Sequence, residues 1–223
     1  WTPARRPGAA TGGDGTMSVR PEIESLLATF VERCKKAGIP ALWEHGTSPD
    51  EYYAATRRFL DESRIVHLAK SKRVNLAEPA SPKYLGGNES ALTDGIKGWN
   101  DYHMHWLGFE GDGLEATIDL GAVRSVSSIG TDFLQDIESW IFMPLTVEFS
   151  ISEDGRRYRA VGAVRNAVPE EKSGAIIEPF GVRFEPSKAR FVRVRAVNMK
   201  MCPPRHKGAG GKAWIFIDEI TVL

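Results

Sequence analysis

From Val74 to its last residue, the sequence is a series of short segments in which apolar and polar residues alternate. The segments "LEATIDLG" and "LTVEFSIS" each place their apolar side chains on one side of an extended chain, which is typical of strands with one buried face. Turn residues separate the segments, and among them Asp154-Gly155 predicts a tight hairpin. Roughly eight strands with no intervening helix predict a mainly β protein, a jelly-roll β-sandwich over residues 73–223.

The preceding segment has a different period. After Pro21, apolar residues recur at helical spacing until Gly38, which stands where a glycine commonly ends a helix. A second helix is predicted from Ser48, which would form a capping box with Glu51. The two helices predict a helical hairpin and linker over residues 21–72, too small to hold its own core. We expect it to dock on the sandwich through Leu27, Phe30, Phe59 or Leu60.

Composition excludes some partners. Lys plus Arg equals Asp plus Glu at 29 residues each, so no net positive field draws nucleic acid or a membrane surface. No apolar run is long enough to span a bilayer, and the first residues lack the pattern of a signal peptide. Residues 1–20, rich in Gly, Pro and Arg, are interpreted as a flexible segment or one introduced by cloning. Cys34 and Cys202 leave both a single bridge and two free thiols open.

Five segments of residues 74–223 occur in the order typical of one domain family. They are "ALTDGIKG", "LEATIDLGAVRSVSSIG", "VEFSISEDGRRY", "ARFVRVRAVN" and "FIDEITVL". Together they resemble the discoidin or coagulation factor V/VIII type C domain, a galactose-binding-like fold that includes family 32 carbohydrate-binding modules. The forms "SPKYLGGNESALTDGIKG", "FLQDIESWIFMP" and "GAGGKAWIFIDEI" are similar to modules appended to bacterial glycoside hydrolases, notably family 20 β-hexosaminidases.

The resemblance implies a noncatalytic carbohydrate-binding module at the C-terminus of a larger secreted bacterial glycoside hydrolase. Its expected partners are a glycan and the catalytic domain of the parent enzyme, with no nucleic acid and no membrane insertion. The parent protein would then be extracellular or periplasmic. The alternative is a structural or protein–protein interaction module that packs on a catalytic domain and binds no sugar.

Catalysis within the chain is not indicated. Imidazoles such as those of His103, His105 and His206 suit zinc or copper, but a His-x-His pair in a loop has no clear third ligand. Nothing in the sequence selects two carboxylates for glycoside cleavage. A nucleophile elbow and a phosphate-binding loop are also absent from the sequence.

The resemblance also implies a structural calcium ion, held by an Asp-Gly loop and a Glu near the last strand. The matching residues are Asp94 and Glu219, with Asp101 or Asn100 in place of the usual threonine. Carboxylates and carbonyls are the oxygen ligands that calcium requires. In the other interpretation, Asp94 caps a turn and Glu219 forms a hydrogen bond to it.

A sugar site needs a flat apolar face for the ring and fixed polar groups for its hydroxyls. Three loops offer this mixture, residues 99–105, 136–142 and 205–212, and in the resembling fold such loops cluster at one end of the sandwich. The candidate ligand-binding residues are Trp99, His103, His105, Asp136, Trp140, Arg205 and His206. The other interpretation places Trp140, which precedes Ile141 and Phe142, in the core.

Overall fold

The structure is a computed structural model that describes residues 19–41, 48–54, 66–103 and 105–223. It divides into two compact units, Trp1–Asp61 and Glu62–Leu223, each described by itself. The docking of the helical hairpin on the sandwich therefore stays a prediction, and two of its residues, Phe59 and Leu60, lie outside the described ranges. No helix in those ranges is long and apolar enough to cross a membrane.

The first unit contains helix α1 (Val19–Lys36). The helix ends as predicted at Gly38, whose φ of +67° lies in the left-handed region that glycine adopts readily. The Ile39 N–H donates to the Cys34 carbonyl at 3.0 Å, which satisfies one of the last carbonyls of the helix.

A second helical segment follows Ser48. The capping box is confirmed, because Glu51 N–H donates to Ser48 Oγ at 3.2 Å and Ser48 N–H donates to Glu51 Oε2 at 2.8 Å. The rings of Phe30 and Tyr52 meet edge to face with centroids 6.1 Å apart. The two helical segments therefore contact each other as a hairpin.

The second unit begins earlier than the predicted boundary at residues 72 and 73. Leu68 N–H donates to the Val222 carbonyl at 2.8 Å, and His67 is buried against Glu219. Contacts of this kind tie residues 66–72 to the β unit, although their sequence has no strand period.

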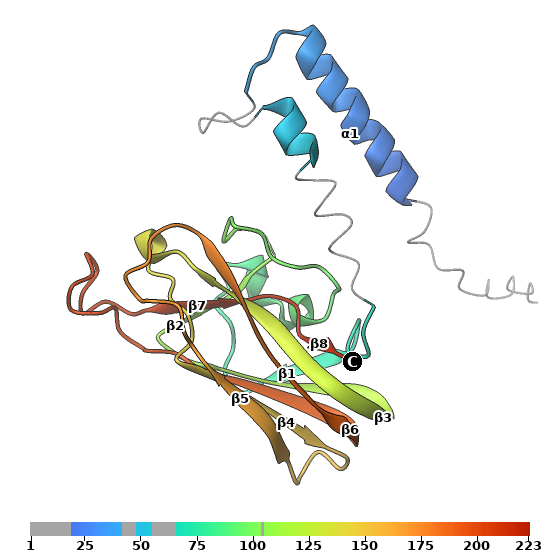
Figure 1. The fold of residues 1–223 in the computed structure, drawn as a ribbon, viewed down its shortest axis with the longest axis vertical. Coiled ribbons are helices and arrows are strands. Elements are labelled where there is room, and N and C mark those ends of the chain that lie inside the picture. The colour runs from blue at the N-terminus through green and yellow to red at the C-terminus, as the bar shows by residue number, and fades with distance from the viewer. Residues whose placement is uncertain (1–18, 42–47, 55–65, 104) are drawn as a thin grey trace, which may run out of the picture. The chain divides into compact units, whose positions relative to one another are not determined.

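The β unit contains one antiparallel sheet of eight strands (Figure 1). The strands are β1 (Arg73–Leu76), β2 (Leu107–Glu110), β3 (Leu114–Gln135), β4 (Thr146–Ser152), β5 (Arg159–Arg165), β6 (Ile176–Val197), β7 (Trp214–Ile217) and β8 (Thr221–Val222). Three short 3₁₀ segments are η1 (Leu85–Gly87), η2 (Glu89–Leu92) and η3 (Ile137–Ser139). The predicted mainly β sandwich is confirmed.

Strands β3 and β6 run through both layers of the sandwich. In one layer, the first half of β3 pairs with β1 and with the second half of β6, and this half of β6 also pairs with β4. In the other layer, the second half of β3 pairs with the first half of β6, with β7 and with β8. Register shifts between Asp119 and Ser128 mark the passage from one layer to the other. The core lies between the layers, where the rings of Phe133 and Phe180 meet at 5.3 Å.

Strand β7 is buried on both faces, which explains its continuous apolar sequence. Its alternate residues Ile215 and Ile217 enter the main core. Trp214 and Phe216 instead form a second cluster with Trp106, against which Tyr84 and Tyr102 pack. The segment before β2 thus covers the outer face of β7 with aromatic side chains.

Candidate functional site

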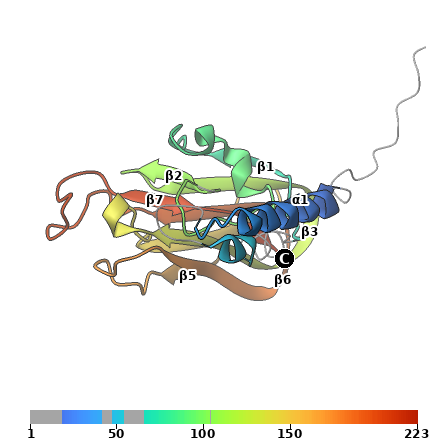
Figure 2. The ribbon, with the colours of Figure 1, turned by 90° about the horizontal axis from the view of Figure 1, so that it is seen from above.

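Two of the three predicted loops meet at one end of the sandwich. Loop 136–142 follows β3 and loop 205–212 precedes β7, and both views place η3 and the latter loop side by side, away from the C-terminus (Figures 1 and 2). His206 Nε2 lies 2.7 Å from the Ile137 carbonyl, and the Trp140 carbonyl accepts from the first residue of β7 at 2.9 Å. Residues distant in sequence therefore form one surface.

Trp140 is the aromatic residue that this surface exposes. Its backbone has φ +65°, a left-handed conformation that is strained for a side chain of this size, and 40% of the residue is exposed. A Cβ on Gly208 would stand 2.7 Å from the Trp140 ring, and one on Gly211 would stand 3.4 Å from it. The indole thus lies against two glycines of the neighbouring loop; we call these three residues the Trp140 platform.

His206 holds the platform together. Its Nδ1 accepts from Gly208 N–H at 3.1 Å, so Nε2 carries the hydrogen and donates to the Ile137 carbonyl. Its ring meets that of Phe142 edge to face at 5.2 Å. Both ring nitrogens of His206 are used within the protein, which gives this residue a positioning role; its contact with a sugar stays a prediction.

Polar groups surround the platform. Asp136 Oδ2 accepts from Ser139 Oγ at 2.9 Å. Glu138 and Lys207 form an ion pair at 2.5 Å between the two loops, and the hydrogen bond from Lys207 lowers the pKa of Glu138. Arg205 is exposed and makes no hydrogen bond or ion pair with the part of the chain that the structure describes.

The third predicted loop, residues 99–105, belongs to the aromatic cover of β7. The Trp99 carbonyl accepts from the Trp106 indole at 2.5 Å. His103 Nδ1 lies 2.9 Å from Asp101 Oδ1, and its ring contacts Tyr102 at 4.1 Å. These contacts join the loop to its own neighbours and to the cluster around Phe216.

Two groups in this loop have shifted pKa values. Burial lowers the pKa of His105, which also has a left-handed φ of +61°. Partial burial acts against ionisation of Asp101, but hydrogen bonds from the His103 backbone and ring lower its pKa. Asp101 is therefore committed to a local turn with His103.

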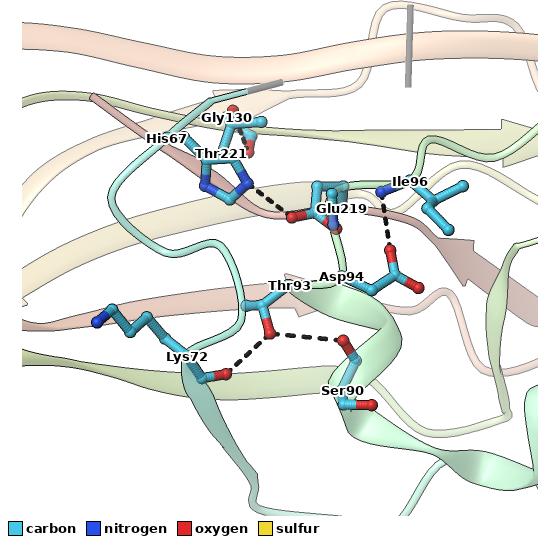
Figure 3. A network of polar contacts seen from close by, with 10 residues as sticks. His67, Lys72, Ser90, Thr93, Asp94, Ile96, Gly130, Glu219 and Thr221 are labelled. Carbon is cyan, nitrogen blue, oxygen red and sulfur yellow. Dashed lines mark hydrogen bonds and ion pairs between the residues drawn. The ribbon is translucent and has the colours of Figure 1, made fainter. Parts of the chain in front are cut away.

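The predicted calcium ligands Asp94 and Glu219 come together, and Asp101 does not join them (Figure 3). Glu219 accepts from Gly95 N–H at 2.8 Å and from His67 at 2.7 Å, one bond to each oxygen. No group of three or more His, Cys, Asp or Glu side chains within the described ranges is placed to hold a metal ion. The turn at Asp94 is capped, because Ile96 N–H donates to Asp94 Oδ1 at 2.8 Å, and the calcium ion stays a prediction.

Sequence reasoning missed the buried polar residues beneath the same loop. Asp218 accepts from Gly98 N–H and from Asp132 N–H, both at 3.0 Å, and Lys97 pairs with Asp132. Burial, followed by the charge of Asp132, raises the pKa of Asp218 well above its usual value. The pairs are 35 to 120 residues apart in sequence, and no local motif connects them.

Two shallow grooves lie elsewhere on the β unit. One, of about 250 Å³, is lined by Ser152, Asp154 and Lys188 among others. The other, of about 260 Å³, is lined by residues that include Glu115 and Arg195. Neither of these two grooves is lined by a predicted ligand-binding residue.

No family model matches the chain, and no curated protein matches it. Among solved structures, it is similar to chitosan-binding module 1 of a chitosanase/glucanase from Paenibacillus sp. IK-5, with 15% identity, a TM-score of 0.46, and coverage of 71% of this chain and 99% of the module. A family 32 module from Clostridium perfringens, in complex with GalNAc-β-1,3-galactose, has 16% identity, a TM-score of 0.45 and coverage of 71% and 99%. A fucose-binding module from Streptococcus pneumoniae has 13% identity, a TM-score of 0.46 and coverage of 71% and 94%. At these identities and scores, no residue role is transferred from them to this chain.

Proposed function

We propose that this chain is a noncatalytic carbohydrate-binding module that holds a glycan on the Trp140 platform. The observation that carries the proposal is Trp140 itself. Its backbone is in a strained conformation, and its indole is half-exposed and lies against Gly208 and Gly211. Strain of this kind is found where function requires it. An indole fixed in this way offers a flat face to the C–H groups of a sugar ring.

The polar groups around the indole complete the proposed site. Arg205 supplies hydrogen-bond donors without a competing partner in the described residues, and Asp136 supplies a carboxylate acceptor. Sugar hydroxyls both donate and accept, so donors and acceptors beside one aromatic face are what a saccharide requires. The groups are held by short loops and lose little freedom when a ligand binds.

We further propose that the module serves as the C-terminal accessory part of a larger secreted bacterial glycoside hydrolase. This part of the proposal rests on the resemblance of the quoted segments to modules of family 20 β-hexosaminidases. In that setting the module would work outside the cytoplasm and would keep the catalytic domain close to its glycan.

The second candidate is a module that packs on a neighbouring protein and binds no sugar. The observation that favours it is on helix α1, where Leu26 and Phe30 are 70% and 43% exposed. Apolar side chains exposed on one element are typical of protein interfaces. The two candidates use different surfaces, so one experiment on Trp140 separates them.

The test is a glycan array with the whole chain, followed by calorimetry with the selected glycan. Trp140→Ala removes the stacking face, which should cost about 1–3 kcal/mol and weaken binding ~5- to 150-fold. Tyr158→Ala is the control, because Tyr158 packs its ring under Arg193 near the turn that joins β4 to β5. Equal affinities of the parent and Trp140→Ala would place the site elsewhere, and a parent that binds no glycan would favour the packing module.

A further inference from the structure

We infer that the loop after η2 is held by the chain's own donors and cations, His67 and Lys70, at the place that the resemblance assigns to calcium. The β unit then folds and stays stable without a bound metal. The inference concerns the anchoring of the loop and does not rest on glycan binding.

Each oxygen of the Glu219 carboxylate accepts a hydrogen bond from the protein. Its side chain and that of His67 are both 0% exposed, and His67 Nε2 lies 2.7 Å from Glu219 Oε1. Its second oxygen accepts from Gly95 N–H at 2.8 Å. A buried carboxylate is costly unless it is hydrogen-bonded, and here each oxygen accepts a hydrogen bond without a metal.

Lys70 brings a positive charge to the neighbouring carboxylate. A Cβ on Gly95 would lie 2.9 Å from Lys70 Nζ, so the ammonium is beside the residue that follows Asp94. The φ of Gly95, +84°, is a second reason for glycine at this position. Asp94 Oδ1 accepts from Ile96 N–H at 2.8 Å, which closes the turn (Figure 3).

Each hydrogen bond to a carboxylate oxygen uses one of its lone pairs and leaves fewer for a metal ion. Calcium requires about six to eight oxygen ligands, whereas both oxygens of Glu219 and one oxygen of Asp94 already accept hydrogen bonds from the protein. The third predicted carboxylate, Asp101, accepts from His103 instead. The segment "HLAK", which contains His67 and Lys70, thus supplies the balancing groups from a part of the chain far from Glu219 in sequence.

The first experiment is thermal unfolding of the parent chain in calcium and in chelator, with elemental analysis of the purified protein. We expect equal midpoints and no stoichiometric calcium. A calcium site at about 100 times its Kd would raise the midpoint by roughly 5–10 °C. A shift of that size, or one calcium ion per chain, would overturn the inference.

The second experiment compares two substitutions of His67. His67→Gln keeps an N–H donor, and His67→Leu removes it and leaves Glu219 buried without a partner on one oxygen. We expect His67→Leu to melt ~5–10 °C below His67→Gln, and calcium to stabilise only the leucine variant. Equal midpoints for the two variants would contradict the role of His67.

Lys70→Met tests the cation, with Lys72→Met as its matched control. Lys72 lies two residues along the same segment, with its ammonium near Gly121 instead. We expect Lys70→Met alone to lower the midpoint by ~2–4 °C and to recover part of it in calcium. Equal midpoints and equal responses to calcium in Lys70→Met and Lys72→Met would show that Lys70 does not hold the loop. If a variant does not fold, the calcium experiment on the parent chain still tests the inference.

Discussion

The platform makes a sharp prediction for Gly208→Ala. The backbone of Gly208 lies outside the left-handed region, so alanine fits its conformation. Its Cβ, however, would stand 2.7 Å from Cε2 and 2.8 Å from Nε1 of Trp140. These distances are shorter than any real contact, and the indole must therefore leave its place on the loop.

The structure bounds the size of the effect. With 40% of Trp140 exposed, roughly 60% of an aromatic surface of about 250 Å² is covered, and losing all of that contact would cost up to ~4 kcal/mol. Accommodating one extra methyl group in a packed site costs about 1–3 kcal/mol. Accommodation of the methyl group costs less than complete loss of the indole contact. We therefore expect the free energy of unfolding to fall by ~1–3 kcal/mol and the melting midpoint to fall by roughly 2–10 °C. A glycan that needs the indole in place should bind ~5- to 150-fold more weakly.

Calorimetry with the glycan selected by the array measures the affinity, and thermal unfolding measures the stability. Gly210→Ala is the control, because Gly210 has a φ of +80° and nothing within 4 Å of a Cβ. Its cost is backbone strain of about 1 kcal/mol without contact with the indole, so its affinity should stay closer to that of the parent. A folded Gly208→Ala variant with undiminished affinity would refute the platform as the binding surface.

Three further outcomes are expected. Deletion of residues 1–70 should lower the melting midpoint more than deletion of residues 1–61, because only the longer deletion removes the buried hydrogen bond between His67 and Glu219. Burial first, and then the charge of Glu219, raises the pKa of Asp94 from 3.8 to about 6. Between these two pH values the folded state holds a proton on Asp94 that the unfolded chain has lost, so the free energy of unfolding falls as the pH rises from 3.8 to about 6. Asp94→Asn should remove much of this dependence of the melting midpoint on pH and should raise the midpoint at pH 7. If Asp94 were a calcium ligand, the same substitution would lower the midpoint. Arg205→Ala should weaken glycan binding in calorimetry at unchanged stability, but His206→Ala should reduce both affinity and midpoint, since its ring joins two loops.

Most of the fold follows from local patterns. The alternation of "LEATIDLG" identifies a half-buried strand, and Gly38 and Ser48 identify helix ends, because each of these signals depends on neighbouring residues alone. The length of β3 and β6 could not be predicted in the same way. The exposed middle of β3 at residues 121–125 interrupts the alternation, and only pairing between distant segments shows that each strand continues into the other layer.

The candidate site was predictable in part for the same reason. The sequence indicates which loops carry aromatic and polar side chains, but their meeting depends on β3 and β7. Trp140 and His206 come together because their loops flank these paired strands. Trp99 and His103 lie in a loop that instead covers the outer face of β7, where the aromatic residues of the strand require a partner. The role of His67 depends on a single contact across 152 residues.

The first and last segments of the β unit lie side by side, joined by the hydrogen bond from Leu68 N–H to the Val222 carbonyl. Ends in this arrangement suit circular permutation. A short linker from Leu223 to residue 66 would close the old ends, and new ends opened between Ser173 and Gly174, in the exposed loop before β6, would break no strand. The permuted unit could then be inserted into a surface loop of a carrier protein with the Trp140 indole kept on its glycines.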